Sequence, residues 1–582
     1  MRRAERRRRE RASQATPARR PGWRFVPWIV AILTFVAFLP ALRAEFVSFD
    51  DVANFVANPG FRGLDWPHLQ WMWTTTLLGH YVPFSWMTLG LDYLLWGMNP
   101  AGYHLVNLLL HSANAVLVYL IARRVFAAAG IGTDGTDDGA ILPSALAALV
   151  FAVHPLRVES VAWITERRDV LSLLFALAST LSFLRAVAEP VRFNRWYGLS
   201  LAAFAAALLS KATTVTLPAV LLILNTYPLR RIGGHSGWWS GSARRVYVEV
   251  APYAVLAAAA SVLSVVVLHP GAQLPVGAKL AVSAYSLAFY LAKTIAPFHL
   301  APLYQMSRPV DPFAPSFLAS YAIVAMLAVA VWTVRRKYPG VVAGALAFTV
   351  VVFPLLGVVQ NGPQIAADRY TYHAAPALAM LIAGGASVLW TSTTLASIGA
   401  VVVFALGLGV WRQCGVWQNS EQLWSRVLEV DGKAAIAHNN LGVLLAERGQ
   451  TTAAIVQYTQ AIQNDSSYAD PHNNLGYELA AQGRADAAIE QYKAAKMIKP
   501  SYAEAEINWG NALSSEKRFE EATTHYARAL ELLPGNAAAE FDWGLALEAQ
   551  NKLPEAAEHL SRAVLSDPSF TDARDALARV TR

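Results

Sequence analysis

A repeat of 34 residues near the end of the chain constrains its fold more than any other feature. A glycine at position 442 returns in the same register in three further copies, and alanines at two other positions keep the same spacing. Small residues at fixed positions let two helices approach closely, and stacked helix pairs bury a continuous core. We therefore predict an α-helical solenoid of four helix pairs over residues 434–582. The small positions are Gly442, Gly476, Gly510, Gly544, Ala454, Ala488, Ala522, Ala556, Ala461, Ala495, Ala529 and Ala563.

Larger residues complete the repeat. A tyrosine follows the first alanine in three copies, a leucine takes its place in the fourth, and a proline closes three copies. The period and this helix–turn–helix pattern are those of tetratricopeptide repeats (TPRs). The positions are Tyr458, Tyr492, Tyr526, Leu560, Pro500, Pro534 and Pro568.

A second ladder runs inside the first, two residues before each repeat glycine. Asn440, Asn474 and Asn508 occupy this position, and Asp542 takes it in the fourth copy. An Asn amide both donates and accepts hydrogen bonds, so it can pair with a peptide backbone. The pattern resembles the asparagine ladder of the O-GlcNAc transferase superhelix, which implies that the array binds extended polypeptide. The alternative is that Asn is a tolerated solvent-facing residue there.

The region before the repeats reads as a membrane domain. The chain is 55% hydrophobic and 15% charged, whereas soluble proteins carry about 25% charged residues. Residues 24–412 hold about a dozen apolar segments, and a crossing helix needs about 20 such residues. We predict an all-α, polytopic membrane domain over 24–412 and a linker over 413–433. The segments begin near residues 24, 102, 142, 168, 196, 212, 247, 278, 316, 339, 375 and 394.

Arginine placement predicts the orientation. Residues 1–20 carry nine Arg and two Glu, which is +7 of the net charge of +8. A basic tail before an apolar run favours a cytosolic tail over residues 1–23 and argues against nucleic-acid binding. Later arginines fall on the same side, but twelve crossings would put the basic triplet 335–337 outside. If one segment between 247 and 297 is partial, the triplet returns to the cytosolic side. We therefore predict about eleven crossing helices in the inner membrane of a bacterium, with the TPRs on its outer side.

Two further features argue against a cleaved signal peptide and against cysteine-based sites. No small-residue cleavage site follows the first apolar run, so we expect a retained helix rather than a removed signal peptide. The single cysteine, Cys414, excludes an intrachain disulfide and a zinc site built on cysteines.

An acidic pair follows the first predicted helix. Asp50 and Asp51 begin a loop, residues 44–101, that is rich in tryptophan. Tryptophan at this density suits a segment lying in the membrane interface. We therefore expect the acidic pair to lie at the membrane interface.

Further polar residues punctuate the apolar helices in a fixed order. His104, His154 and Glu159 come first, followed by Arg168 with Asp169, then Lys211, and finally Arg369 with Tyr370. Together with the acidic pair and the TPRs, this set resembles the transmembrane-and-TPR O-mannosyltransferases and their bacterial relatives. These are GT-C glycosyltransferases. The chain departs from them at Lys211-Ala212, where the relatives usually have Lys-Glu, which puts substrate choice in doubt.

The resemblance implies a function. A GT-C enzyme of this kind moves a sugar, most often mannose here, from a polyprenyl-phosphate donor to hydroxyls of a polypeptide held by the TPRs, by inverting displacement. It implies Asp50, or else Asp51, as the catalytic base. It implies that three cations bind the donor phosphate and that five polar side chains support the site. The cations are Arg168, Lys211 and Arg369, and the supporting residues are His104, His154, Glu159, Asp169 and Tyr370.

Each of these residues has a structural alternative. The aspartates could cap the helix that begins near Val52, His154 and Glu159 could be a satisfied polar pair, and the cations could anchor helix ends at the head groups. A non-catalytic membrane scaffold and a transporter are the alternative functions. We predict no dedicated metal site, although a carboxylate and the donor phosphate could share a divalent cation. The lipid bilayer is the remaining partner.

Overall fold

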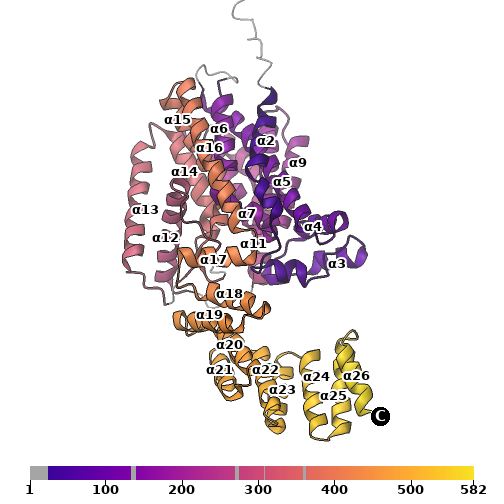
Figure 1. The fold of residues 1–582 in the computed structure, drawn as a ribbon. Helices are drawn as coiled ribbons and strands as arrows, with labels where there is room; N and C mark the ends of the chain where they lie inside the picture. The colour runs from indigo at the N-terminus through magenta and orange to yellow at the C-terminus, as the bar shows by residue number, and fades with distance from the viewer. Residues whose placement is uncertain (1–23, 133–138, 269–273, 307–308, 358–361) are drawn as a thin grey trace, which may run out of the picture. The chain divides into compact units, whose positions relative to one another are not determined.

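The computed structural model of the chain describes residues 24–132, 139–268, 274–306, 309–357 and 362–582. The chain divides into two compact units, Met1–Leu423 and Trp424–Arg582, which we describe separately. Figure 1 shows that both units consist almost wholly of helices, as predicted. The predicted cytosolic tail, residues 1–23, lies outside the described residues.

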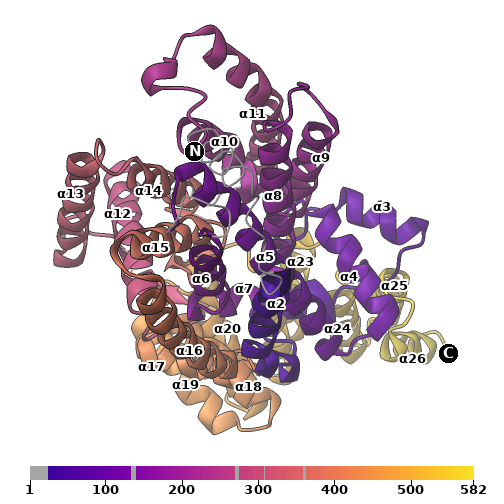
Figure 2. The ribbon, with the colours of Figure 1, turned by 90° about the horizontal axis from the view of Figure 1, so that it is seen from above.

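Five helices in the described part of the first unit are long and apolar enough to cross a membrane, and a sixth crossing results if a pair bent by 56° counts as one. The bent pair is α6 with α7. The longest helix, α5, packs against α2 (Val26–Ala37), α6 and α8, and Figure 2 shows these helices grouped around it. The helices are α5 (Pro100–Ala129), α6 (Ile141–Ala152), η5 (Pro155–Arg157) with α7 (Val158–Ala162), η6 (Ile164–Glu166) with α8 (Arg167–Ala186), α11 (Gly241–Leu268), α13 (Pro315–Val334) and α16 (Ser392–Val416).

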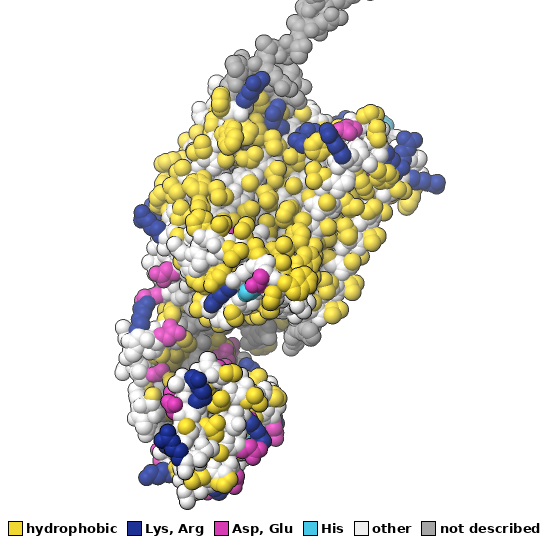
Figure 3. All heavy atoms as spheres, turned by 90° about the vertical axis from the view of Figure 1, so that its right-hand side faces the viewer, with side chains coloured by type: hydrophobic (Ala, Val, Ile, Leu, Met, Phe, Trp, Pro, Cys, Tyr) yellow, Lys and Arg dark blue, Asp and Glu magenta, His cyan; other side chains and the backbone are white. Residues whose placement is uncertain are grey.

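Three of these helices turn apolar side chains outward. Only 11% of the most apolar window of α13 is buried, and 17% of the corresponding windows of α11 and α16. Figure 3 shows hydrophobic side chains over most of the face that the first unit presents in that view. An exposed apolar surface of this extent marks contact with another apolar phase, and for helices of this length that phase is lipid. The first unit is therefore a membrane domain.

Each of the twelve predicted segments coincides with a helix, but several helices are short. The first, α2, has 12 residues, which span about 18 Å at about 1.5 Å per residue, against about 30 Å for the hydrocarbon core. Length and composition alone therefore do not fix how many helices cross, and eleven crossings stays a prediction. The remaining helices of this set are α9 (Arg195–Ser210), η7 (Ala212–Thr216) with α10 (Leu217–Thr226), α12 (Val276–Ile295), α14 (Pro339–Val352) with η9 (Phe353–Leu355), and α15 (Ala375–Leu389).

Helix α12 lies where one partial segment is expected. Its first turn, at Gly277, packs against Pro312, which stands just before α13. In its last turn, a backbone carbonyl lies 3.0 Å from Nε2 of His154. Lys337, just after α13, lines a cavity together with Gly130 at the end of α5. Both ends of α12 thus lie away from Lys337, and the basic triplet 335–337 shares one end of the unit with the last turns of α5.

The predicted interfacial loop, residues 44–101, folds into short helices. Figure 1 shows α3 and α4 running across the direction of α5. Phe55, Phe61, Met72 and Trp86 belong to one buried hydrophobic cluster, which includes side chains of both helices. Trp66 remains 76% exposed, as suits an indole at the level of the head groups. The short helices are η2 (Leu39–Arg43), the single π-helical turn η3 (Val52–Val56), α3 (Trp66–Thr74), η4 (Leu77–Gly79) and α4 (Pro83–Trp96).

A small ribbon anchors one of the predicted site segments. Strands β1 (Tyr304–Gln305) and β2 (Gln364–Ala366) pair antiparallel, with Tyr304 opposite Ala366. Directly after β2 comes the 3₁₀ turn η10 (Asp368–Thr371). The hydroxyl of Tyr304 donates a hydrogen bond to Oδ1 of Asp368 at 3.0 Å. The ribbon therefore fixes the turn that carries Arg369.

The second unit contains the predicted solenoid. The repeat glycine has a steric cause: a Cβ at Gly442 would lie 2.5 Å from the ring of Tyr458, and one at Gly544 would lie 2.7 Å from Leu560. Only glycine lets the second helix of each pair insert that side chain. The TPR prediction is confirmed, and α26 (Thr571–Val580) covers the last pair as an additional helix. The pairs are α18 (Ala435–Glu447) with α19 (Thr451–Asn464), α20 (Ala469–Ala481) with α21 (Ala485–Ile498), α22 (Ala503–Ser515) with α23 (Phe519–Leu532), and α24 (Ala537–Ala549) with α25 (Leu553–Ser566).

The predicted linker, residues 413–433, is mostly helical. Helix α16 ends at Val416, and α17 (Ser420–Val430) begins after three further residues. Leu423, Trp424 and Val427 are buried at helical spacing along one face of α17. The prediction missed this helix because it is short and lies between a membrane segment and the first repeat.

Candidate functional site

Asp51 is fully buried, and its carboxylate holds a loop together. Oδ2 accepts a hydrogen bond from Val47 N at 3.0 Å, while Oδ1 accepts from Thr165 N at 3.2 Å and from Thr165 Oγ1 at 2.6 Å. Neither oxygen caps the turn that begins at Val52. Burial raises the pKa of Asp51 to about 7, against the opposing effect of these hydrogen bonds. Asp51 therefore ties the loop after α2 to η6.

Asp50 is the more open member of the pair. Its side chain is partly exposed, and no residue in the described part of the chain donates a hydrogen bond to it. Burial raises the pKa of Asp50, although the nearby charges of Arg168 and Arg369 lower it. An accessible carboxylate with a raised pKa suits a general base. The geometry therefore favours Asp50 over Asp51 for that role.

The three predicted phosphate-binding cations converge on one carboxylate, Glu166. Arg168 Nη2 lies 3.0 Å from Glu166 Oε1, Lys211 Nζ lies 2.6 Å from Oε2, and Arg369 Nε lies 3.5 Å from Oε1. The cations come from the first turn of α8, the end of α9 and η10. Sequence analysis missed Glu166, although it belongs to a charged run, residues 166–169, at the start of an apolar helix.

Lys211 is held between two carboxylates. Besides Glu166, it contacts Asp169, whose Oδ1 lies 2.7 Å from its Nζ. The other oxygen of Asp169 accepts a hydrogen bond from Ser160 Oγ at 3.0 Å. Ala212, which replaces the usual glutamate, is partly buried at the start of η7. Because Glu166 and Asp169 already flank the ammonium, Lys211 has its counter-charges without a carboxylate at position 212.

Glu159 fixes Arg369 at two points. One carboxylate oxygen accepts a hydrogen bond from Arg369 N at 2.7 Å, and the other forms an ion pair with Arg369 Nη1. The guanidinium also lies 5.3 Å from the ring centroid of Trp163 and 5.0 Å from that of Tyr370. Trp163 in turn stacks on Trp417. These contacts leave the Arg369 side chain 10% exposed in a defined position.

The other predicted supporting residues position the backbone. Nδ1 of His154 accepts from Leu156 N at 3.2 Å, so its Nε2 carries the proton. His104 is buried against the backbone of residues 44 and 45. The hydroxyl of Tyr370 accepts a hydrogen bond from Gln364 at 2.7 Å. The contacts of His154 and His104 thus hold segments in place, whereas the ring of Tyr370 also lies beside the guanidinium of Arg369.

Two further residues lie near the cluster, and the sequence analysis missed the first of them, His80. His80 lies in the interfacial loop, and the charge of Arg168, together with burial, lowers its pKa to about 3. It therefore stays neutral beside the cations. Arg167 is wholly buried and pairs with Asp92 at 2.6 Å, which ties α8 to α4. A lone loop histidine gives no motif that could have identified His80.

The described residues contain no group of three or more His, Cys, Asp or Glu arranged to hold a metal ion. The carboxylates of Glu159, Glu166 and Asp169 are all paired with cations. Asp50 alone among the cluster carboxylates is left partly open. A divalent cation shared between such a carboxylate and a donor phosphate stays a prediction.

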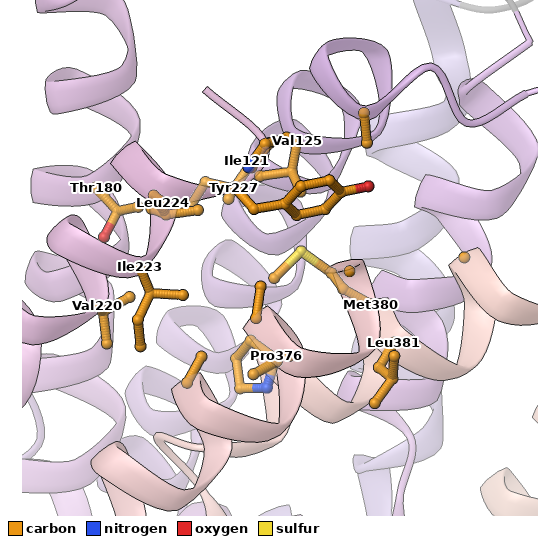
Figure 4. Close-up of a pocket in the computed structure, with 18 of the residues that line it drawn as sticks. Ile121, Val125, Thr180, Val220, Ile223, Leu224, Tyr227, Pro376, Met380 and Leu381 are labelled. Carbon is orange, nitrogen blue, oxygen red and sulfur yellow. The ribbon is translucent and has the colours of Figure 1, made fainter. Parts of the chain in front are cut away.

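An apolar cavity of about 430 Å³ begins beside the cluster. Thr213 and His373 line one part of it, and His373 Nδ1 lies 3.7 Å from Asp169 Oδ1. Lys337 and Tyr227 line another part, toward the end of the unit where α5 finishes. Figure 4 shows apolar side chains of α5, α10 and α15 around the space. The labelled residues are Ile121, Val125, Thr180, Val220, Ile223, Leu224, Tyr227, Pro376, Met380 and Leu381.

Comparison with known proteins agrees with both units. A family model described as TPR repeat matches residues 444–479, and two described as tetratricopeptide repeat match 469–502 and 513–580. Protein O-mannosyl-transferase TMTC4 of Homo sapiens is 27% identical over 494 residues, which cover 74% of this chain and 65% of that protein. The chain is a distant relative of the protein O-mannosyl-transferases.

A second relative and a solved structure match smaller parts of this chain. Protein O-mannosyl-transferase Tmtc1 of Drosophila melanogaster is 35% identical over 199 residues, which cover 32% of this chain and 21% of that protein. The chain thus spans between 21% and 65% of these two relatives of the protein O-mannosyl-transferases. The crystal structure of YrrB, titled a TPR protein with an unusual peptide-binding site, is 23% identical, covers 27% of this chain and 80% of its own, and has a TM-score of 0.24.

The predicted peptide-binding ladder is also a structural ladder. The amide of Asn474 donates to Oδ1 of Asn439 in the preceding repeat, and Asn508 donates to Asn473 in the same way, both at 3.0 Å. Asp542 accepts from Asn511 at 3.0 Å, and the amide of Asn440 donates to its own helix at 2.8 Å. Each ladder Asn is partly exposed. Oδ1 of Asn474 also accepts a hydrogen bond from the amide of Asn473 at 3.4 Å. The peptide-binding role of the ladder stays a prediction.

Proposed function

We propose that this chain is a membrane glycosyltransferase that transfers mannose from a polyprenyl-phosphate donor to hydroxyls of a polypeptide held by the TPR groove. One observation carries the proposal: the partly open carboxylate of Asp50 lies near three clustered cations, and an apolar cavity begins beside this cluster, at Thr213 and His373. Such a site joins a base, an anion-binding group and a space for an apolar chain. The names of the relatives support the sugar and the acceptor class.

The residues suggest a single displacement. Asp50 takes the proton of the acceptor hydroxyl as its oxygen bonds to the anomeric carbon of the sugar. The bond from that carbon to the phosphate oxygen breaks, and its electron pair leaves with the phosphate. Attack from the face opposite the leaving group inverts the anomeric carbon. Arg168, Lys211 and Arg369 stabilise the charge that develops on the phosphate.

One hydrogen-bond donor of the cation cluster, Nε of Arg168, lacks an acceptor among the described residues. This nitrogen is also buried. A buried N–H without a partner is costly, and a phosphate oxygen would satisfy it. Glu166 holds the three cations together in the meantime, because three unpaired cations would repel one another. This supports the cluster as a phosphate site.

The cavity suits the lipid part of the donor. It is lined mainly by Leu, Ile, Val and Ala side chains and reaches from the cluster along α8 and α10. Its volume of about 430 Å³ falls in the range of ligand pockets. A polyprenyl chain placed there would leave its phosphate beside Lys211 and Arg168. The head group and the lipid tail would then meet at one point of the protein.

The proposal places the reaction outside the cytoplasm of a bacterium, at its inner membrane. Asp50 follows the end of α2, whereas the basic triplet 335–337 shares the opposite end of the unit with the last turns of α5. The positive-inside rule assigns the arginine-rich end to the cytoplasm. The acceptor polypeptide and the TPRs then share the outer compartment.

The test uses the full-length protein in lipid nanodiscs, a radiolabelled polyprenyl-phosphate mannose and a periplasmic protein extract. We expect label in protein with the wild type and at least a hundredfold less with Asp50→Asn, since a general base contributes about 10²–10⁴ in rate. The matched control is Glu45→Gln, an exposed carboxylate on the same loop.

The outcome decides between the proposal and its alternative. Loss of transfer in Asp50→Asn but not in Glu45→Gln supports the enzyme. A folded wild type that transfers nothing from mannose, glucose or arabinose donors would favour a non-catalytic scaffold instead. The same assay with EDTA tests the proposed sharing of a divalent cation between a carboxylate and the donor phosphate.

A further inference from the structure

In each TPR a histidine on one helix forms a hydrogen bond with a side chain on the other helix. This histidine lies on the first helix in the first two TPRs and on the second helix in the last two. His438 and His472 on the first helices contact glutamines on the second helices, at 2.7 and 2.8 Å. In the third and fourth repeats, the first helix carries glutamate and the second carries histidine. Nδ1 of His525 lies 2.7 Å from Glu506 Oε2, and Nδ1 of His559 lies 2.6 Å from Glu540 Oε2.

A tryptophan completes each of the reversed pairs. Trp509 stacks on His525 with ring centroids 4.1 Å apart, and Trp543 stacks on His559 at 4.0 Å. The first two repeats have leucine at this position. The third and fourth repeats therefore build the same corner from one glutamate, one histidine and one tryptophan, which we call the Glu–His–Trp corner.

A lysine of the chain itself occupies the corner of the third repeat. Nζ of Lys496 lies 2.7 Å from Glu506 Oε1 and 5.6 Å from the ring centroid of Trp509. A carboxylate and an indole face are the two groups that recognise an ammonium ion. The corner of the third repeat thus displays its own ligand.

The corner of the fourth repeat lacks this lysine. The residue 34 positions after Lys496 is Leu530, and an open cavity of about 610 Å³ lies there, lined by Leu530, Glu540, Trp543 and Arg562 among others. The side chain of Glu540 is 9% exposed. His559 engages its Oε2, while no described residue contacts its Oε1. Arg562 pairs with Glu558 rather than with Glu540.

We infer that the Glu–His–Trp corner of the fourth repeat binds a lysine side chain of a polypeptide, with the ammonium on Glu540 Oε1 and over the face of Trp543. Lys496 shows the geometry in the neighbouring repeat. The ligand is a primary ammonium on an apolar stem, which Leu530 contacts. That this polypeptide is also the acceptor of sugar rests on the proposed function, but the binding itself does not.

The experiment measures binding to the full-length protein in detergent, without any sugar donor. The probe is a fluorescent peptide of glycine, serine, threonine and alanine with one central lysine. We expect its affinity to exceed that of the same peptide with acetyl-lysine at least tenfold. Ethanolamine distinguishes the source of the ammonium when the two affinities are compared: we expect it to displace the peptide only at concentrations far above the Kd of the peptide, and half-displacement at a concentration near that Kd would favour a lipid head group and overturn the inference.

Two matched exchanges separate this corner from the rest of the array. Leu530→Lys supplies an internal lysine like that of the third repeat and should lower peptide affinity at least tenfold. Lys496→Leu empties the third corner and should raise the number of bound peptides from one to two. Glu540→Gln should act like Leu530→Lys.

Equal binding of the lysine and acetyl-lysine peptides, or unchanged affinity in Leu530→Lys, would overturn the inference. A protein that binds the peptide but transfers no sugar would contradict only the proposed function.

Discussion

Glu159 holds Arg369 through both the backbone and the side chain: one carboxylate oxygen accepts from Arg369 N at 2.7 Å, and the other pairs with the guanidinium. The two residues lie 210 positions apart in the chain. The contact sets both the position of η10 and the direction of the Arg369 side chain. Because the cation must meet a developing negative charge, its placement bears directly on the proposed transfer.

Glu159→Gln should therefore reduce transfer while leaving the fold intact. Gln keeps the shape and can still accept from Arg369 N, but it removes the charge that orients the guanidinium. We expect kcat to fall at least tenfold with little change in donor KM, because a misdirected cation is felt mainly in the transition state. The control is Glu189→Gln, an exposed carboxylate in the turn that follows α8. Equal kcat in the two variants would contradict the positioning role.

The rate of transfer should depend on the protonation of Asp50. A base must be ionised, so the rate falls as the pH drops below its pKa. Since burial raises the pKa of Asp50, the acid limb of the pH–rate profile should lie above about 3.9, the value of an ordinary aspartate. Initial rates measured across acidic to neutral pH test this. An acid limb that persists unchanged in the residual activity of Asp50→Asn would assign it to another group.

Asp51 should instead affect how the stability of the protein depends on pH. Its pKa is raised from 3.8 in the unfolded chain to about 7 in the folded protein. Between these two pKa values only the folded protein keeps the proton on Asp51. The contribution of this proton to the free energy of unfolding is therefore fully present below the pKa of the unfolded chain, and it is lost as the pH rises through the pKa of the folded protein. The Tm of the wild type should thus fall more from about pH 5 to about pH 8 than that of Asp51→Asn.

The Asp51→Asn variant should also be less stable in the acidic part of this range. In this range Asp51 is protonated, but its hydroxyl oxygen can still accept a hydrogen bond from a backbone N–H, whereas the NH₂ group of Asn cannot. The expected loss is about 1–3 kcal/mol. A variant as stable as the wild type at every pH would refute the structural role of this carboxylate.

Filling the cavity should weaken use of long-chain donors. Ala347 lines the cavity, and Trp in its place would occupy the space. We expect kcat/KM for a long-chain polyprenyl donor to fall at least tenfold, with a smaller effect on a short-chain donor. Leu346→Trp is the control, because Leu346 is the neighbouring residue on α14, is 50% exposed and does not line the cavity. Similar losses with both chain lengths would mean that the cavity does not hold the lipid.

The asparagine ladder should contribute to polypeptide binding beyond its structural contacts. Replacing Asn440, Asn474 and Asn508 by Ala removes the amides that could pair with a peptide backbone. We expect the affinity for an unfolded polypeptide to fall at least tenfold. Gln463→Ala on the exposed face of α19 is the control. Unchanged affinity in a folded triple variant would leave the ladder with its inter-repeat role alone.

Local spacing alone determined much of this protein. The 34-residue period predicts the TPRs because each repeat glycine packs against a tyrosine or leucine side chain of its partner helix. The two residues of each such pair lie within one repeat. Apolar runs predict the membrane helices for a similar reason, since burial in lipid is a property of each segment. The three cations were candidates because they match the family resemblance and lie beside apolar helices, and their binding of a phosphate stays a prediction.

Only the tertiary structure decided how those residues work together. Whether Asp50 or Asp51 is open depends on Thr165, 114 residues away, which engages Asp51. Glu166 becomes the centre of the cluster because Lys211 and Arg369 arrive from helices 45 and 203 positions along the chain. Contacts between residues so far apart in the chain produce no regular spacing that could be recognised in the sequence. They arise from helix packing, which brings distant charges together where burial makes pairing obligatory.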